Sequence, residues 1–360
     1  MQRLIFALLT YLLFVTRLRL LLAFALFSAF PARADIADFY RGKAVNIIVG
    51  YGPGGGYDLY ARLLGRYLGA HIPGNPSIVV QNMPGAAGLR AANYIAAAAP
   101  KDGTAIATFD MNIPLLGFLG DPNVQYDPRR FTWLGSMSDS SGDAYVLFAR
   151  KASAALSAAD LRRAETPLLT VGVIGPGATD YDLGVMLRDV FGFRLKIVPG
   201  YPNTAAVGLA IQNGEIDGEF IGLISSKLVN PHWFGPGSNM HVLLQFARTT
   251  RHPSLPDAPT VRELFPDPQY KALLDATESP YKLIRPYVAP PGIPPDRAAA
   301  LQDAFRAATS SIALRAEAEK LNLEVSPVLA AEAVSRIDEL SRTPQDVIAQ
   351  LRLLREGAPK

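Results

Sequence analysis

The sequence contains no cysteine among its 360 residues. Disulfide bonds, a thiolate nucleophile, cysteine-ligated zinc and a lipid on an N-terminal cysteine are therefore excluded. Histidine is scarce, and the four histidines stand singly without metal-ligand spacing: His71, His232, His241 and His252. No serine lies in a nucleophile-elbow pattern. We therefore expect no catalytic residue, no metal and no cofactor.

Acidic residues are absent from the first 34 residues, which carry four arginines. Apolar runs at 4–15 and 20–30 precede a small-x-small sequence at 32–34. This layout is typical of a secretory signal peptide, and each run is shorter than the ~20 residues that span a bilayer. We predict a cleaved signal peptide at 1–34 and a periplasmic protein. The segment is long for a signal, and a translation start near Val15 would explain its length.

Basic charge is also lacking once that segment is removed. The net charge of +3 falls to about −1 without the four arginines. No basic patch remains to bind nucleic acid or anionic lipid, so we expect neither as a partner. The remaining chain is long enough to form more than one lobe.

Strand and helix patterns alternate along the chain. Apolar runs followed by turns predict strands at 45–49, 77–80, 104–109, 171–174, 195–198, 216–220 and 242–246. Helical spacing predicts helices at 58–68, 89–99 and 204–213, and a mostly helical segment at 295–356. Residues 251–295 are dense in proline and are predicted as surface loops. The β-α-β-α-β order predicts parallel sheets with helices on both faces.

One pattern occurs twice. A strand leads into Gly-Pro-Gly at 52–54 and then Tyr-Asp-Leu at 57–59, and the same sequence recurs at 175–177 and 181–183. Chance similarity of two strand-to-helix turns is the alternative. We interpret the repeat as two α/β lobes with matched glycine turns.

The first glycine turn favours an anion as its ligand. Glycines let backbone N–H groups approach a ligand closely, and the helix start beyond them carries partial positive charge. The letters Gly50-x-Gly52-x-x-Gly55 also match a dinucleotide fingerprint. The second strand, however, ends in Gln81-Asn82 without the acid expected for a ribose, and Pro53 removes one backbone donor. We therefore favour a small anion over a nucleotide.

Binding energy indicates that two lobes are needed. A helix N-terminus contributes ~0.3–1 kcal/mol, whereas micromolar capture needs about 8 kcal/mol. Several charge-assisted hydrogen bonds, each roughly 1.5–3 kcal/mol, must therefore come from both sides of a cleft. We predict capture by closure of the lobes around a hinge.

Three segments together resemble a known family. They are Gly-Pro-Gly-Gly-Gly-Tyr-Asp-Leu-Tyr-Ala-Arg at 52–62, Gln-Asn-Met-Pro-Gly-Ala-Ala-Gly at 81–88 and Ala-Pro-Lys-Asp-Gly-Thr at 99–104. In this order they look like the Bug-type periplasmic receptors of tripartite tricarboxylate transporters. The segments at 255–260 and 288–294 fit the same family. The resemblance runs from about Phe39 to the C-terminus.

The resemblance implies an α/β type II periplasmic binding fold, in which two lobes with mainly parallel sheets are joined by two crossover strands. We place these strands near 144–149 and 242–247. The implied lobes are 35–143 with 248–360, and 144–247. The resemblance also implies a carboxylate held by backbone amides and bridging waters. The implied substrate contacts are Gly54, Gly55, Gly56, Tyr57, Asp58, Gly85, Ala86, Asp110, Met111, Gly177, Ala178, Thr179, Tyr201, Asn203 and Thr204.

Departures from the family pattern concern specificity. Tyr57 stands where the family has threonine, and Met83 and Ala87 replace arginine and glycine. The expected ligand is therefore a small organic acid or amino acid rather than a tricarboxylate in particular. Asp180 near the mouth is interpreted either as a contact for an amino group or as a helix cap.

The expected function is transport by a monomeric solute-binding protein, with membrane transporter subunits as partners. Two alternatives stay open. One is a sensory receptor that presents its bound form to a kinase, and the other is an exported enzyme that uses the same cleft.

Overall fold

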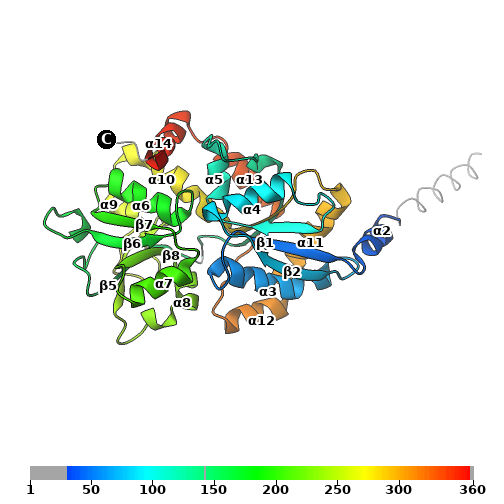
Figure 1. The fold of residues 1–360 in the computed structure, drawn as a ribbon, viewed down its shortest axis with the longest axis horizontal. Coiled ribbons are helices and arrows are strands. Elements are labelled where there is room, and N and C mark those ends of the chain that lie inside the picture. The colour runs from blue at the N-terminus through cyan, green and yellow to red at the C-terminus, as the bar shows by residue number, and fades with distance from the viewer. Residues whose placement is uncertain (1–30, 142, 357–360) are drawn as a thin grey trace, which may run out of the picture.

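The computed structural model describes residues 31–141 and 143–356, and it shows two lobes, each with its own sheet (Figure 1). Most of the predicted signal peptide lies outside the described residues. Helix α2 (Pro31–Tyr40) continues across the predicted cleavage position after Ala34. No helix within the described ranges combines the length and apolar character that a membrane crossing requires.

The first lobe is built on a six-stranded sheet of order β11-β4-β10-β3-β1-β2. Its strands are β1 (Ala44–Val49), β2 (Ser77–Asn82), β3 (Ala105–Thr108), β4 (Thr132–Ser138), β10 (Ile284–Ala289) and β11 (Val328–Leu329). Its helices are α3 (Gly56–His71), α4 (Leu89–Ala97), α5 (Ile113–Phe118), α11 (Pro295–Ser310), α12 (Ile312–Lys320) and α13 (Ala330–Leu340). The helix predicted at 58–68 is α3, and its residues Leu63, Leu64 and Leu68 are buried and belong to the same core cluster as Val45 and Ile47 of β1.

The second lobe is built on a five-stranded sheet of order β7-β6-β8-β5-β9. Its strands are β5 (Tyr145–Arg150), β6 (Leu169–Val173), β7 (Leu195–Pro199), β8 (Gly218–Gly222) and β9 (Met240–Phe246). Its helices are α6 (Thr179–Asp189), α7 (Thr204–Gln212) and α8 (Leu223–Val229). Short 3-10 turns occur at Ala86–Gly88, Pro128–Arg130, Asp160–Arg162, Pro231–Trp233, Pro268–Tyr270 and Ser279–Leu283.

The predicted two-lobed α/β fold is confirmed. The strands that alternate with helices pair in parallel, β1 with β2 and β3, and β6 with β7 and β8. The returning strands β10, β4, β11, β5 and β9 pair antiparallel, so both sheets are mixed. The chain enters the second sheet through β5 and leaves it through β9, and these strands pair with each other.

The prediction of surface loops at 251–295 is wrong for β10. All six residues of this strand are buried, and it lies between β3 and β4 in the first sheet. Pro286 argues against a central strand because it cannot donate a ladder hydrogen bond. The strand tolerates the proline because β3 pairs only with Tyr287 and Val288, beside a register irregularity.

The segment after β9 packs against the second lobe before the chain returns to the first. Helices α9 (Val261–Leu264), α10 (Lys271–Glu278) and the C-terminal α14 (Gln345–Glu356) contribute to the core cluster that contains Leu183 and Phe220. The same cluster contains Leu115 and Leu119 of the first lobe, so it joins the lobes, and the lobe limit at 247/248 stays a prediction. Figure 1 shows α14 above α6 and α10.

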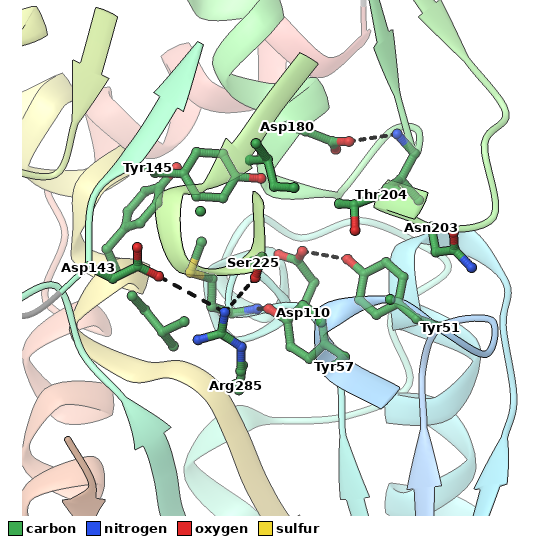
Figure 2. A pocket seen from close by; sticks show the side chains of 18 of the residues that line it. Tyr51, Tyr57, Asp110, Asp143, Tyr145, Asp180, Asn203, Thr204, Ser225 and Arg285 are labelled. Atoms are coloured by element: carbon green, nitrogen blue, oxygen red, sulfur yellow. Dashed lines mark hydrogen bonds and ion pairs between the residues drawn. The ribbon is translucent and has the colours of Figure 1, made fainter. Parts of the chain in front are cut away.

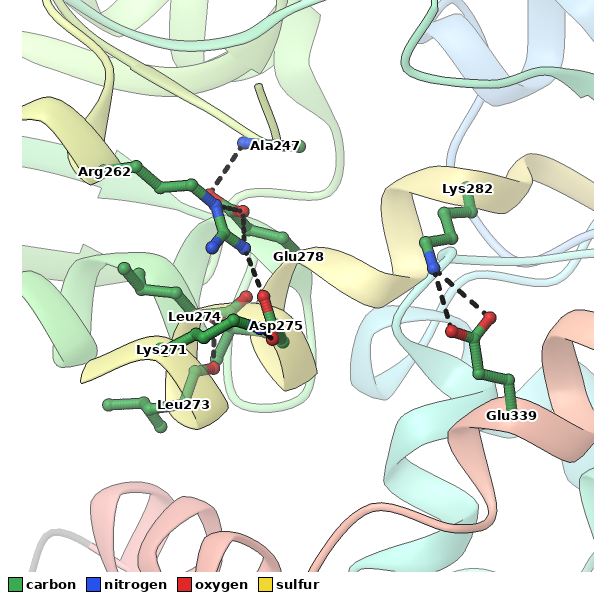
Figure 3. A network of polar contacts seen from close by, with 10 residues as sticks. Ala247, Arg262, Lys271, Leu273, Leu274, Asp275, Glu278, Lys282 and Glu339 are labelled. Atoms are coloured by element: carbon green, nitrogen blue, oxygen red, sulfur yellow. Dashed lines mark hydrogen bonds and ion pairs between the residues drawn. The ribbon is translucent and has the colours of Figure 1, made fainter. Parts of the chain in front are cut away.

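Polar contacts fix this return path (Figure 3). Buried Glu278 accepts a 3.0 Å hydrogen bond from the backbone N–H of Ala247, where β9 ends, and Arg262 donates to it at 2.6 Å. Beyond α10, Lys282 forms an ion pair with Glu339 of α13 at 3.2 Å. The second crossover is therefore held at its exit from β9.

Candidate ligand-binding cavity

A cavity that is partly open to solvent lies between the lobes (Figure 2). The first sheet and its loops contribute Tyr51, Gly55, Gly56, Tyr57, Asp110, Met111, Ile284 and Arg285, and the connecting segments contribute Ser140, Asp143 and Tyr281. The second lobe contributes Tyr145, Ile174, Asp180, Asn203, Thr204, Ile221, Gly222 and Ser225. A cavity shared by both lobes is present, and Ile174 and Asp180 at the two ends of the second glycine turn line it, whereas residues 175–179 do not.

The predicted contact residues fall into three groups. Those that line the cavity are Gly55, Gly56, Tyr57, Asp110, Met111, Asn203 and Thr204. Gly85, Ala86 and Tyr201 line an adjoining hollow that shares Tyr51 and Ile174 with the cavity, and Thr179 lines a third hollow. Gly54, Asp58, Gly177 and Ala178 are not among the lining residues of these three spaces.

The glycine run at 54–56 brings the lobes close together. A Cβ atom on Gly56 would lie 2.8 Å from Ser225 Oγ, and one on Gly55 would lie 3.2 Å from Asn203 Cβ. Asn203 donates a 2.9 Å hydrogen bond to the carbonyl of Pro53. The lobes can approach this closely because Gly55 and Gly56 have no side chains.

Helix N-termini from both lobes meet at the cavity. Helix α3 begins at Gly56, α6 at Thr179 and α7 at Thr204, and residues at each of these starts line the cavity. Amide groups in a first helical turn have no intrahelical acceptor and carry partial positive charge. The arrangement therefore favours a negatively charged group in the cavity.

Asp58 and Asp180 brace the turns. Asp58 accepts a hydrogen bond from the Gly54 amide at 2.9 Å, which occupies that donor. Asp180 accepts from the amides of Ile174 at 2.7 Å and Tyr181 at 2.8 Å, one on each oxygen. Burial raises the pKa of Asp180 to about 8. These two bonds fit the capping interpretation of Asp180, and each oxygen keeps a further lone pair that can accept a hydrogen bond from a ligand.

Tyr57, which stands where the family has threonine, adds an aromatic ring and a hydroxyl group to the cavity wall of the first lobe. Its hydroxyl accepts a 3.0 Å hydrogen bond from the amide of Met111, and its ring stacks on Tyr51 with centroids 4.7 Å apart. Tyr51 donates to Asp110 at 2.5 Å, and Thr179 of the other lobe donates to the same carboxyl at 2.6 Å. Asp110 therefore links the lobes, while burial raises its pKa.

Arg285 on β10 is a cavity residue that the sequence analysis missed. It is 3% exposed and donates hydrogen bonds to Ser138 at 2.8 Å and to Ser225 at 2.6 Å. Ser225 belongs to the second lobe, so the guanidinium spans the cleft. It also lies 4.0 Å from the centre of the Tyr60 ring. An arginine inside an otherwise apolar run at 284–289 is the signal that could have identified it.

Asp143 is the acid nearest to Arg285. Its Oδ2 lies 4.0 Å from Arg285 Nη2, and both residues are buried. Its other oxygen accepts hydrogen bonds from the amides of Ala144 and Ile224. Burial raises the pKa of Asp143, and the nearby guanidinium opposes that change. Within the described ranges no cluster of acids and histidines has the composition of a metal site.

Comparisons with known proteins agree with this architecture. No protein-family model matches the chain. A curated relative from Agrobacterium vitis, the UPF0065 protein in the TAR-I ttuE-ttuC' intergenic region, is 28% identical over 239 residues, which are 65% of this chain and 64% of the relative. The match thus spans less than two thirds of that relative's length.

Solved structures match over most of the chain. The periplasmic binding protein BugD superposes with a TM-score of 0.67 at 20% identity and covers 88% of this chain and 98% of its own. MatC from Rhodopseudomonas palustris, solved with bound malate, has a TM-score of 0.65 at 21% identity. The match covers 87% of this chain and 99% of MatC. The predicted resemblance is confirmed, and the fold is that of the periplasmic binding proteins.

Proposed function

We propose that the protein is a periplasmic solute-binding receptor that captures a small carboxylate-bearing molecule between its lobes and delivers it to a membrane transporter. The observation that carries this proposal is the cavity shared by both lobes, which is lined by residues from the first turns of α3, α6 and α7 and by a buried arginine. A carboxylate placed there receives charge-assisted hydrogen bonds from both sides.

Interlobe contacts support capture by closure. Thr179 bonds Asp110, Asn203 bonds the Pro53 carbonyl, and Arg285 bonds Ser225, so both lobes are held together around the cavity. A ligand that contacts both lobes favours this arrangement over an open one, because only the closed form supplies every contact. The malate-bound structure of MatC is consistent with an acid as the ligand.

Binding is tested with the mature protein and a panel of organic acids and amino acids. We expect a carboxylate to raise the melting temperature, to give a heat of binding and to reduce the radius of gyration in scattering. Thr204→Trp should abolish binding by filling the cavity, whereas Thr250→Trp, at an exposed position, should leave it unchanged. A panel in which no acid binds would contradict the proposal.

Delivery requires a separate measurement. Cells that express the receptor should accumulate the radiolabelled acid faster than cells that lack it, and Thr204→Trp should not restore uptake. Normal uptake without the receptor, combined with tight binding in vitro, would favour a sensory role. If the purified protein converted the acid into a product, the alternative of an exported enzyme would be favoured.

A further inference from the structure

Four tyrosines, three isoleucines and a methionine form the apolar part of the cavity lining. Tyr51 and Tyr57 form a stacked pair, and Tyr145 and Tyr281 form an edge-to-face pair with centroids 5.2 Å apart. Figure 2 shows Tyr145 across the cavity from Tyr51 and Tyr57. Side chains of this kind bind a ligand through apolar area and ring stacking rather than through charge.

Acidic side chains outnumber basic ones in the cavity lining. Arg285 is the single basic side chain among its lining residues, and Asp110, Asp143 and Asp180 are acids that share the lining. All three carboxyl groups already accept hydrogen bonds from amides or hydroxyls of the protein. A ligand with two or three carboxylates would place one on Arg285 and find no second basic side chain in the lining for the others.

The backbone conformation and the hydrogen bonds of Arg285 are those expected of a residue that binds a ligand. Its backbone has φ of +59°, which is unfavourable for a residue with a side chain and costs of order 1 kcal/mol. Its hydrogen bonds go to neutral serine hydroxyls, and with its nearest carboxylate, Asp143, it forms a 4.0 Å ion pair without a hydrogen bond. A buried guanidinium without a bonded carboxylate can therefore receive one from a ligand.

Tyr281 offers the ligand a further polar group. The hydroxyl of Tyr281 is buried, lines the cavity and makes no hydrogen bond within the described part of the chain. A buried hydroxyl without a partner costs free energy, so a ligand oxygen that accepts its hydrogen would be favoured.

We infer that the cavity is built for a monocarboxylate with an aromatic or apolar body, and that Arg285 binds its carboxylate directly. The body lies between the two tyrosine pairs, and Tyr281 donates a further hydrogen bond. This inference rests on the proposed function and narrows its substrate class from carboxylates in general to monoanions with a large apolar surface.

The first experiment compares ligands by calorimetry on the mature wild-type protein. The probes are benzoate and phenylacetate as monocarboxylates, benzamide as the neutral isostere of benzoate, and malate and citrate as polyanions. We expect a monocarboxylate to bind at least tenfold more tightly than benzamide, malate or citrate. Tighter binding of malate or citrate would overturn the inference and leave the proposed function intact. Binding of no acid at all would overturn both.

The second experiment tests Arg285 with variants of matched chemistry. Arg285→Met should weaken binding of the monocarboxylate about ten- to hundredfold, and Arg285→Lys less, because lysine keeps the charge but not the two serine contacts. Arg297→Met is the control, since Arg297 lies on α11, donates to the Asp102 carbonyl and is not among the cavity residues. Tyr281→Phe should weaken binding severalfold.

Folding of the variants is checked by circular dichroism before binding is measured. If Arg285→Met does not fold, Arg285→Lys and the comparison of benzoate with benzamide decide the matter. Unchanged affinity in a folded Arg285→Met or Arg285→Lys variant, or equal binding of benzoate and benzamide, would overturn the role of Arg285.

Discussion

The two glycine turns share a sequence pattern but are supported in different ways. In the first lobe Asp58 accepts hydrogen bonds from Arg62 and from Asn82, which both belong to the same lobe. In the second lobe Asp182 occupies the equivalent position. Its carboxylate accepts from Asn112 of the first lobe at 2.6 Å and pairs with Arg355 of the C-terminal helix.

This difference assigns distinct roles to the turns. The bonds of Asp58 lie within its own lobe, so the support that it gives the first turn does not depend on contact between the lobes. Asp182 receives one of its bonds across the cleft, so that bond exists only when the lobes are together. We therefore expect a ligand to meet a preorganised first lobe and to complete the second by closure.

The largest expected effect follows from removing the charge of Asp58. In Asp58→Asn the new amide group faces the N–H groups of Gly54, Arg62 and Asn82, which are all donors. We expect a loss of about 2–3 kcal/mol in the free energy of unfolding, because charged hydrogen bonds in a buried site are broken. Urea denaturation measures this loss. Asp38→Asn, in an exposed pair with Arg41, is the control and should change it by less than ~0.5 kcal/mol.

The effect of Asp58 should also depend on pH. Burial alone would raise the pKa of Asp58, but the hydrogen bonds from Arg62, Gly54 and Asn82 outweigh it and lower the pKa below 3.8. The ionised form therefore stabilises the folded state above that value, and the contribution disappears as pH falls through the lower, folded-state pKa. The difference in unfolding free energy between wild type and Asp58→Asn should therefore become smaller in acid. An unchanged difference would show that the ionised carboxylate is not its cause.

Much of the fold could be predicted because local patterns decide it. The strands β1, β2, β6 and β7 are apolar runs that end in glycine or polar turns, and the repeated glycine turn predicted two lobes that share a cavity. Backbone amides and helix starts follow directly from such turns, so the place of the cavity could be predicted as well.

The chemistry of the cavity could be predicted only in part. Arg285 lies far along the chain from the glycine turns, in a strand whose proline resembles a loop, and only tertiary pairing with β3 and β4 brings it to the cleft. Asp58 was expected as a ligand contact because the family resemblance implies it, and that role stays a prediction. In the structure it bonds Gly54, Arg62 and Asn82, and no local pattern reveals Asn82, which comes from β2.

A smaller effect, mainly on affinity, is expected from the matched change in the second lobe. In Asp182→Asn the amide oxygen can still accept from Asn112 and Arg355, because both bond the same Oδ2, and the Oδ1 site has no partner within the described residues. We expect about fivefold weaker ligand binding, equivalent to ~1 kcal/mol, with a smaller loss of stability than in Asp58→Asn. Calorimetry and urea denaturation on both variants test this. An equal stability loss in the two variants would remove the distinction between the turns.

The smallest expected effects come from adding one methyl group to each turn. Gly56 starts a helix without positive φ, so Gly56→Ala should leave the unfolding free energy nearly unchanged, but its Cβ would lie 2.8 Å from Ser225 across the cleft and should weaken binding a few-fold. Gly177 has φ of +92° and its Cβ would find ordinary contact with Leu116 at 3.5 Å. Gly177→Ala should therefore cost about 1 kcal/mol of stability through backbone strain. If Gly56→Ala instead lost stability and kept its affinity, the glycine would serve the local fold of α3, and the close approach of the lobes would not depend on it.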